Sequence, residues 1–132
     1  MKGLKALAAV LAITAIGASA VPAAAQAPAS ASAAPAPFRH YVACGIERSS
    51  KPAHSCAKRS KKGAFFKSLK KDVFYAVCVV FPSGKHLCAH AQPAKQGTLY
   101  VNKITSTQVG LHKVTWYVKG KSVGSSVFRV TG

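Results

Sequence analysis

The sequence predicts an all-β protein whose folded part is a small β-sandwich of about six or seven short strands with two disulfide bonds. Three observations support this prediction. Residues 110–132 have the apolar pattern of a β-hairpin, and residues 73–81 (VFYAVCVVF) have the composition of a buried central strand. Four cysteines lie in the same part of the chain, and that part has no strong helical period.

The N-terminal region precedes the predicted domain. Two lysines are followed by an apolar core and then by small residues, which is the order of a secretory signal peptide, and we assign it to residues 1–25. The apolar run is too short to span a bilayer, so we expect no transmembrane segment. Residues 26–37 (QAPASASAAPAP) form an Ala/Pro/Ser-rich linker. Residues 38–132 then form one domain, and we expect a secreted, extracellular protein that associates with the cell surface or acts beyond it.

The cysteine count predicts two disulfide bonds, because an even number of cysteines in a small exported domain usually forms a disulfide framework. Cys78 and Cys88 are nearly symmetric about the turn at residues 81–85, so a bridge across one hairpin is natural. By elimination Cys44 pairs with Cys56 and closes a polar loop. On the loop-entropy argument each bridge contributes about 2–3 kcal/mol to stability.

Turn signals separate the predicted strands. Residues 38–46 have strand-like content, and residues 47–55 form a polar loop that contains a proline. The central strand at residues 73–81 ends at Pro-Ser-Gly, and residues 87–91 return antiparallel to it. A further strand is expected at residues 98–104 before the closing hairpin.

The closing hairpin has the clearest pattern. Every second residue from His112 to Val118 is apolar or aromatic, as in a strand with one buried face. A Gly-centred turn at residues 119–121 leads into a second apolar run at residues 123–130. Three small residues, 124–126, interrupt this run, as a bulge or a local twist would.

These residues resemble the last two strands of bacterial immunoglobulin-like domains on exported proteins. The shared features are a Gly-x-(Tyr/His)-x-Val-x-Trp-x-Val strand, a glycine turn, and a Val-Gly-Ser…Phe-x-Val ending. The resemblance covers about the last 23 residues and implies an immunoglobulin-like sandwich. In such sandwiches a tyrosine two residues after the glycine closes the corner with a hydroxyl hydrogen bond. His112 stands at that position here.

Positive charge dominates the composition. Seventeen of the 19 Lys and Arg residues lie beyond residue 25, where the acidic side chains are Glu47 and Asp72. Such a charge attracts anionic partners: a cell-surface polymer, an acidic polysaccharide or an anionic lipid surface, with nucleic acid possible but less favoured. The alternative is that the charge only keeps an exported protein soluble.

The most basic stretch, residues 58–71 (KRSKKGAFFKSLKK), has two interpretations. As a helix it would be a cationic amphipathic segment suited to a membrane surface. As a loop followed by a strand, it would send its aromatic residues into the sandwich and leave the lysines on the rim. A glycine and the β-forming run that follows favour the strand. We expect the anion-binding surface to consist of Lys58, Arg59, Lys61, Lys62, Lys67, Lys70 and Lys71.

The sequence argues against catalysis and against a cofactor. Hydrolysis needs paired carboxylates or an oriented base, and two isolated acidic residues provide neither. There is no Gly-rich phosphate loop and no CxxC motif. His86, Cys88 and His90 share one face of a strand and would ligate zinc or copper only if the cysteine were free. We therefore expect no catalytic and no metal site.

The leading functional hypothesis is a non-catalytic, secreted, immunoglobulin-like module that binds an anionic partner. The first alternative is a small cationic antimicrobial or membrane-active protein. The second is a ligand carrier or inhibitor, because the hairpin around Cys78 and Cys88 is similar to one in the neocarzinostatin-type carrier sandwiches of actinomycetes.

Overall fold

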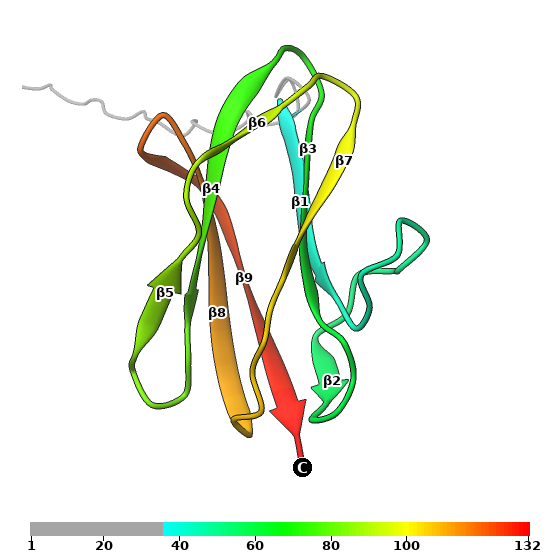
Figure 1. The fold of residues 1–132 in the computed structure, drawn as a ribbon, viewed down its shortest axis with the longest axis vertical. Helices are drawn as coiled ribbons and strands as arrows, with labels where there is room; N and C mark the ends of the chain where they lie inside the picture. The colour runs from blue at the N-terminus through cyan, green and yellow to red at the C-terminus, as the bar shows by residue number, and fades with distance from the viewer. Residues whose placement is uncertain (1–35) are drawn as a thin grey trace, which may run out of the picture. The chain divides into compact units, whose positions relative to one another are not determined.

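The computed structural model describes residues 36–132, which contain nine β-strands and no helix (Figure 1). The signal peptide and most of the linker predicted above lie outside the described residues. One sheet has three strands and the other has six. The three-stranded sheet has the order β1 (Phe38–Ala43), β3 (Gly63–Ser68), β7 (Leu99–Lys103). The larger sheet has the order β2 (Ser55–Ala57), β9 (Lys121–Thr131), β8 (Gly110–Val118), β4 (Val73–Val80), β5 (His86–Cys88), with β6 (Gln92–Ala94) also paired to β4.

The strand order is that of an immunoglobulin-like sandwich. In that fold strands A, B and E share one sheet and strands C, F and G share the other. Here β1, β3 and β7 occupy the first set of positions, and β4, β8 and β9 occupy the second. The short strand β2 runs parallel to β9. The predicted all-β, immunoglobulin-like sandwich is therefore confirmed, with nine strands instead of six or seven because three-residue strands leave no periodic pattern in the sequence.

The core fills the space between the two sheets. Trp116 is fully buried at its centre, and the predicted alternation along β8 is confirmed, since His112, Val114, Trp116 and Val118 are all buried. The ring of Phe66 from β3 stacks on that of Tyr75 from β4, with centroids 4.3 Å apart. These contacts join the two sheets through aromatic side chains, which bury large apolar areas for their number.

A bulge interrupts the closing hairpin next to the predicted residues 124–126, which themselves pair regularly with β8. Gly124 lies opposite Trp116, but the next residue of β8 lies opposite Ser122, so Val123 is the extra residue. The His40 ring of β1 stacks on the Trp116 ring at 4.7 Å between centroids. A Cβ atom added to Gly124 would fall on the His40 ring. Gly124 therefore permits a histidine of one sheet to cover the central tryptophan of the other.

His112 closes the corner where a tyrosine was expected from the resemblance. Its Nδ1 lies 3.2 Å from the Gly110 carbonyl oxygen, and its Nε2 lies 2.7 Å from Ser106 Oγ. If Nδ1 donates to the carbonyl, Nε2 accepts the serine hydroxyl proton, which is the pattern of a neutral ring. The ring also stacks on Phe128 at 4.9 Å. Burial lowers the pKa of His112, and the nearby Lys62 charge adds to this effect, while the bond to Gly110 opposes it.

Both predicted disulfides are confirmed. Cys78 of β4 and Cys88 of β5 are direct partners across the hairpin. Cys44 and Cys56 close the loop between β1 and β2, separated by 12 positions in sequence. All four cysteines are paired, so none is free among residues 36–132.

Candidate anion-binding surface

The basic stretch at residues 58–71 forms a loop, a strand and a turn. Its central part is β3, so the strand interpretation is confirmed and the amphipathic helix does not form. Only one of the two phenylalanines enters the sandwich. Phe66 joins the core, whereas Phe65 points to the other face of the sheet, where it stacks on Tyr41 at 4.9 Å and is fully buried. The expectation that both rings enter the core was wrong, because adjacent strand residues point to opposite faces.

The predicted anion-binding residues do not form one cluster. Four of them precede β3, Lys67 lies near the end of β3, and Lys70 and Lys71 lie in the turn beyond it. The four steps along β3 from Gly63 to Lys67 span about 14 Å. The structure therefore divides these residues between two ends of the three-stranded sheet.

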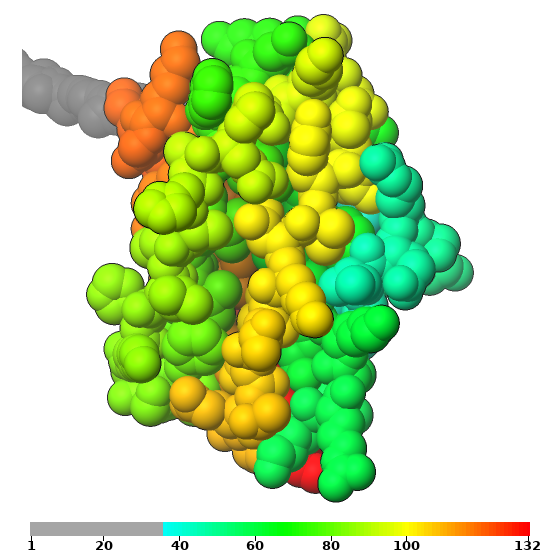
Figure 2. Space-filling model, viewed as in Figure 1, coloured from blue at the N-terminus to red at the C-terminus, as the bar shows by residue number. Residues whose placement is uncertain are grey.

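The larger group faces a second segment of the chain across a hollow of about 420 Å³, which we call the basic hollow. Figure 2 shows the two segments side by side, residues 58–62 in green and residues 103–107 in yellow to orange. The lining residues are Lys58, Arg59, Ser60, Lys61, Lys62, Lys103, Ile104, Thr105, Ser106 and Thr107. None of these is acidic, so the hollow carries only positive charge.

Lys103 also lines the hollow, although it is not among the predicted anion-binding residues. It is an isolated lysine in sequence, and no local pattern distinguishes it. The pairing of β3 with β7 places Lys103 opposite Gly63, directly beside the basic loop. The Ile104 backbone N–H also donates to the Lys62 carbonyl oxygen at 2.8 Å and ties the two segments together.

Lys62 has a different position from its neighbours, with only 2 % of its surface exposed. Its ammonium group donates to the backbone carbonyls of Lys58 at 3.0 Å, Ser60 at 2.8 Å and Ser106 at 3.5 Å. Burial lowers the pKa of Lys62. These bonds occupy its donors, so Lys62 supports the walls of the hollow, and the exposed cations of the hollow are Lys58, Arg59, Lys61 and Lys103.

The two acidic residues lie apart from each other and from the hollow. Glu47 is in the loop closed by Cys44 and Cys56, and Asp72 is in the turn between β3 and β4. The Asp72 carboxylate accepts a hydrogen bond of 2.8 Å from the Gln96 backbone N–H. A carboxylate pair of the kind used in glycoside hydrolysis is not formed by residues so placed.

The histidines near Cys88 do not assemble a metal site with it. Cys88 is bonded to Cys78, and His86 and His90 are exposed. Within residues 36–132 no group of three or more His, Cys, Asp or Glu side chains is placed to hold a metal ion. In the same range no helix has the length and apolar character needed to cross a membrane.

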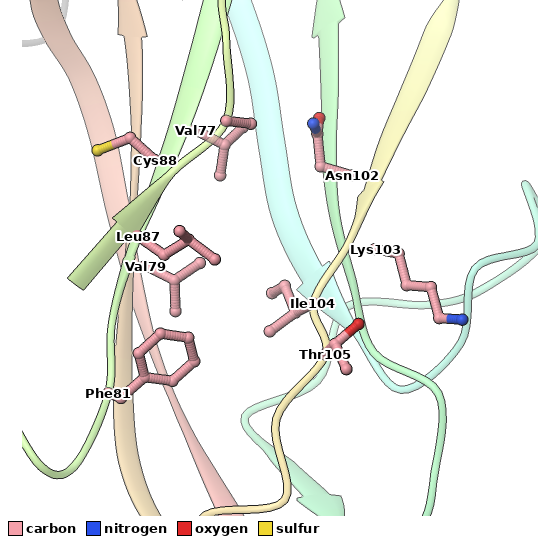
Figure 3. Close-up of a pocket in the computed structure, with 10 residues that line it drawn as sticks. Val77, Val79, Phe81, Leu87, Cys88, Asn102, Lys103, Ile104 and Thr105 are labelled. Atoms are coloured by element: carbon pink, nitrogen blue, oxygen red, sulfur yellow. The ribbon is translucent and has the colours of Figure 1, made fainter. Parts of the chain in front are cut away.

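A second concavity lies between the β4–β5 hairpin and the segment after β7, with a volume of about 260 Å³. Figure 3 shows Leu87, Val79 and Phe81 pointing across it toward Ile104, while the Lys103 side chain points away. Leu87 is 64 % exposed although it is on the inner face of its sheet, because the three-stranded sheet ends at β7. We call this concavity the apolar groove.

Comparisons with known proteins assign the chain to no family. No protein-family model and no curated protein matches the chain. An immunoglobulin-like protein from Pseudomonas aeruginosa is similar in structure, with a TM-score of 0.47 and 15 % identity over 72 % of this chain and 92 % of that one. An alkylpurine DNA glycosylase from Pseudomonas fluorescens, bound to DNA with an abasic site analogue, has a TM-score of 0.38 and 16 % identity. The match covers 74 % of this chain but 31 % of the glycosylase, and neither likeness carries information on ligand or activity.

Proposed function

We propose that the domain is a non-catalytic binding module that acts outside the cell and contacts an anionic polymer through the basic hollow. The observation that supports this is the convergence of four exposed cations from two distant segments on one hollow that has no acidic lining residue. If the positive charge served only solubility, the lysines would be expected to be scattered over the surface. A concentration of one sign around a concavity raises the local potential and attracts ligands of the other sign.

The hollow is also held in shape before any ligand binds. The buried Lys62 ammonium links carbonyls on both sides, and the Ile104–Lys62 backbone bond joins the segments. A preorganised site loses less conformational freedom on binding. The hydroxyls of Thr105 and Thr107 add neutral donors beside the cations, which suits an oxyanion.

An extracellular site of action fits the chemistry of the chain. Two disulfides in a domain of this size are typical of oxidising compartments. The predicted signal peptide at residues 1–25 points the same way. The absence of a carboxylate pair near the hollow supports binding without turnover.

The test is binding of the oxidised protein to immobilised sulfated or uronic-acid polysaccharide, with a neutral glycan as reference, at low and raised salt. Neutralising the hollow with Lys58→Gln, Arg59→Gln, Lys61→Gln and Lys103→Gln should weaken binding at least tenfold. A control of equal charge change replaces Lys95, Lys113, Lys119 and Lys121, which are exposed and do not line the hollow. Equal losses in both variants would mean that only net charge matters and would contradict the proposal.

A vesicle-leakage assay with the same protein distinguishes polysaccharide binding from a membrane-active role. Anionic lipid vesicles loaded with dye should retain it, because the basic segment is fixed in a sheet and a loop and cannot form the amphipathic helix that inserts into a lipid surface. Leakage at concentrations that leave polysaccharide binding unsaturated would favour the membrane-active alternative instead.

The apolar groove supports a second candidate function, that of a carrier for a small apolar ligand. The specific observation is the exposed inner-face leucine, Leu87, above a floor formed by Val79 and Ile104. Small-molecule sites are typically concave and mostly apolar. The neutral dye Nile red should then bind to the protein, and Leu87→Asn should weaken this binding while Val80→Asn, on the other face of the same hairpin, should not. Equal dye binding by the wild type and Leu87→Asn would exclude the apolar groove as the binding site.

A further inference from the structure

The outer face of the three-stranded sheet has an ordered distribution of charge. The strand registers define three rows of outward residues across β1, β3 and β7. The rows are Arg39, Lys67 and Leu99; Tyr41, Phe65 and Val101; and Ala43, Gly63 and Lys103. Cations therefore stand at both ends of this face, and its middle row is uncharged.

The two charged ends belong to different groups. At one end Arg39 of β1 lies directly opposite Lys67 of β3. At the other end Lys103 lies beside the basic hollow, so that its charge continues into the cations of residues 58–61. The two ends are about 14 Å apart along β3. A single small anion would reach only one of them.

The middle row is an aromatic and aliphatic strip. Tyr41 stacks on the buried Phe65, and the Arg39 guanidinium lies 5.6 Å from the Tyr41 ring centroid. Val101 is 38 % exposed beside them. Phe65 is fully buried, so the accessible members of this strip are the half-buried Tyr41 and the exposed Val101 on either side of it. An uncharged edge of this kind suits the apolar faces of sugar rings.

We propose that this outer face binds an extended anionic polysaccharide, whose charged groups contact both ends while its sugar rings cross the Tyr41–Val101 strip. The inference rests on the proposed function of the basic hollow and extends it with a second contact, Arg39 and Lys67. Charge complementarity at two separated points favours a chain over a compact anion. Two linked contacts bind more tightly than either alone only when the ligand spans both, so affinity depends on chain length.

The experiment measures the affinity of the oxidised protein for size-defined heparin oligosaccharides, from disaccharide to dodecasaccharide, by calorimetry. Affinity should rise at least tenfold at the length that spans both ends. The double variant Arg39→Gln/Lys67→Gln should remove this rise while leaving disaccharide affinity unchanged. It should also reduce the magnitude of the slope of log K against log salt by about 1–2, as expected for two lost polyelectrolyte contacts. The control Lys119→Gln/Lys121→Gln should retain the rise.

The strip is tested separately with a charge placed on it. Val101→Glu should weaken only the long oligosaccharides, and Val127→Glu, on an exposed position of the other sheet, should not. Short oligosaccharides that bind at the hollow without any rise with length would overturn this inference but keep the proposed function. No binding at any length would overturn both. Tighter binding of single-stranded DNA of equal charge would assign the face to nucleic acid and would also overturn the inference.

Discussion

Replacement of Gly124 by alanine tests how the bulge and the core depend on each other. The added Cβ would meet the His40 ring, which covers Trp116, so the ring must move off the tryptophan. Forcing an extra carbon into a packed site typically costs about 1–3 kcal/mol. Loss of an aromatic-type stack adds about 0.5–1.5 kcal/mol. Together these two effects should lower the free energy of unfolding by about 2–4 kcal/mol, in addition to the backbone strain of alanine at the Gly124 φ of 159°.

A double-mutant cycle separates this clash from other effects of the substitution. In a His40→Ala background the space beside Gly124 is open, and Gly124→Ala should then cost only the backbone strain at its φ of 159°, about 1–3 kcal/mol. The difference between the two backgrounds is the coupling energy of the contact, which is expected only for residues that touch. The assay is guanidinium unfolding of the oxidised protein, followed by the fluorescence of its single tryptophan.

Gly84→Ala is the matched control. Gly84 has φ of 89°, but a Cβ there would meet nothing within 4 Å. Its substitution should cost about 1–2 kcal/mol, from the left-handed backbone alone, and should not depend on residue 40. A coupling energy below about 0.5 kcal/mol between residues 40 and 124 would refute the argument that Gly124 makes room for the histidine.

Three further predictions concern His112, the hairpin disulfide and Lys62. Burial favours the neutral ring of His112 and lowers its pKa in the folded state, while an unfolded histidine titrates near pH 6.5. The contribution of His112 to the free energy of unfolding should therefore be complete above that pH and should decrease as the pH falls toward the lowered folded-state pKa. Urea titrations at several pH values should show this decrease in the wild type and not in His112→Asn. Removing the hairpin disulfide with Cys78→Ala/Cys88→Ala should lower the free energy of unfolding by about 3 kcal/mol in denaturant titrations, and an unchanged value would contradict this. Lys62→Met keeps the apolar stem but removes three hydrogen bonds, so the Ile104 amide should exchange faster with deuterium; unchanged exchange would mean that Lys62 does not hold the hollow together.

The parts of the fold that could be predicted are those that local patterns specify. The period of two from His112 to Val118 identified the buried face of β8 because one residue in two must face the core. The symmetry of Cys78 and Cys88 about a turn identified their bridge for the same local reason. The bulge near Gly124 followed from small residues that interrupt an apolar run.

The site was harder to predict because it depends on pairings between distant segments. Lys103 reaches the basic hollow only through the register of β3 with β7, which no local pattern encodes. Lys62 resembles its neighbours in sequence, but its ammonium is buried because three carbonyls happen to converge on it in the fold. Phe65 and Phe66 are adjacent aromatic residues of β3, and the alternation of side chains along a strand would have assigned them to opposite faces of the sheet.

The most direct test of the binding surface is an NMR titration of the ¹⁵N-labelled, oxidised protein with a heparin oligosaccharide long enough to span both ends. The account predicts chemical-shift changes at residues 58–62 and 103–107 and at Arg39 and Lys67, with the β4–β5 hairpin unaffected. Changes confined to the β4–β5 hairpin, or spread evenly over every exposed lysine, would contradict it.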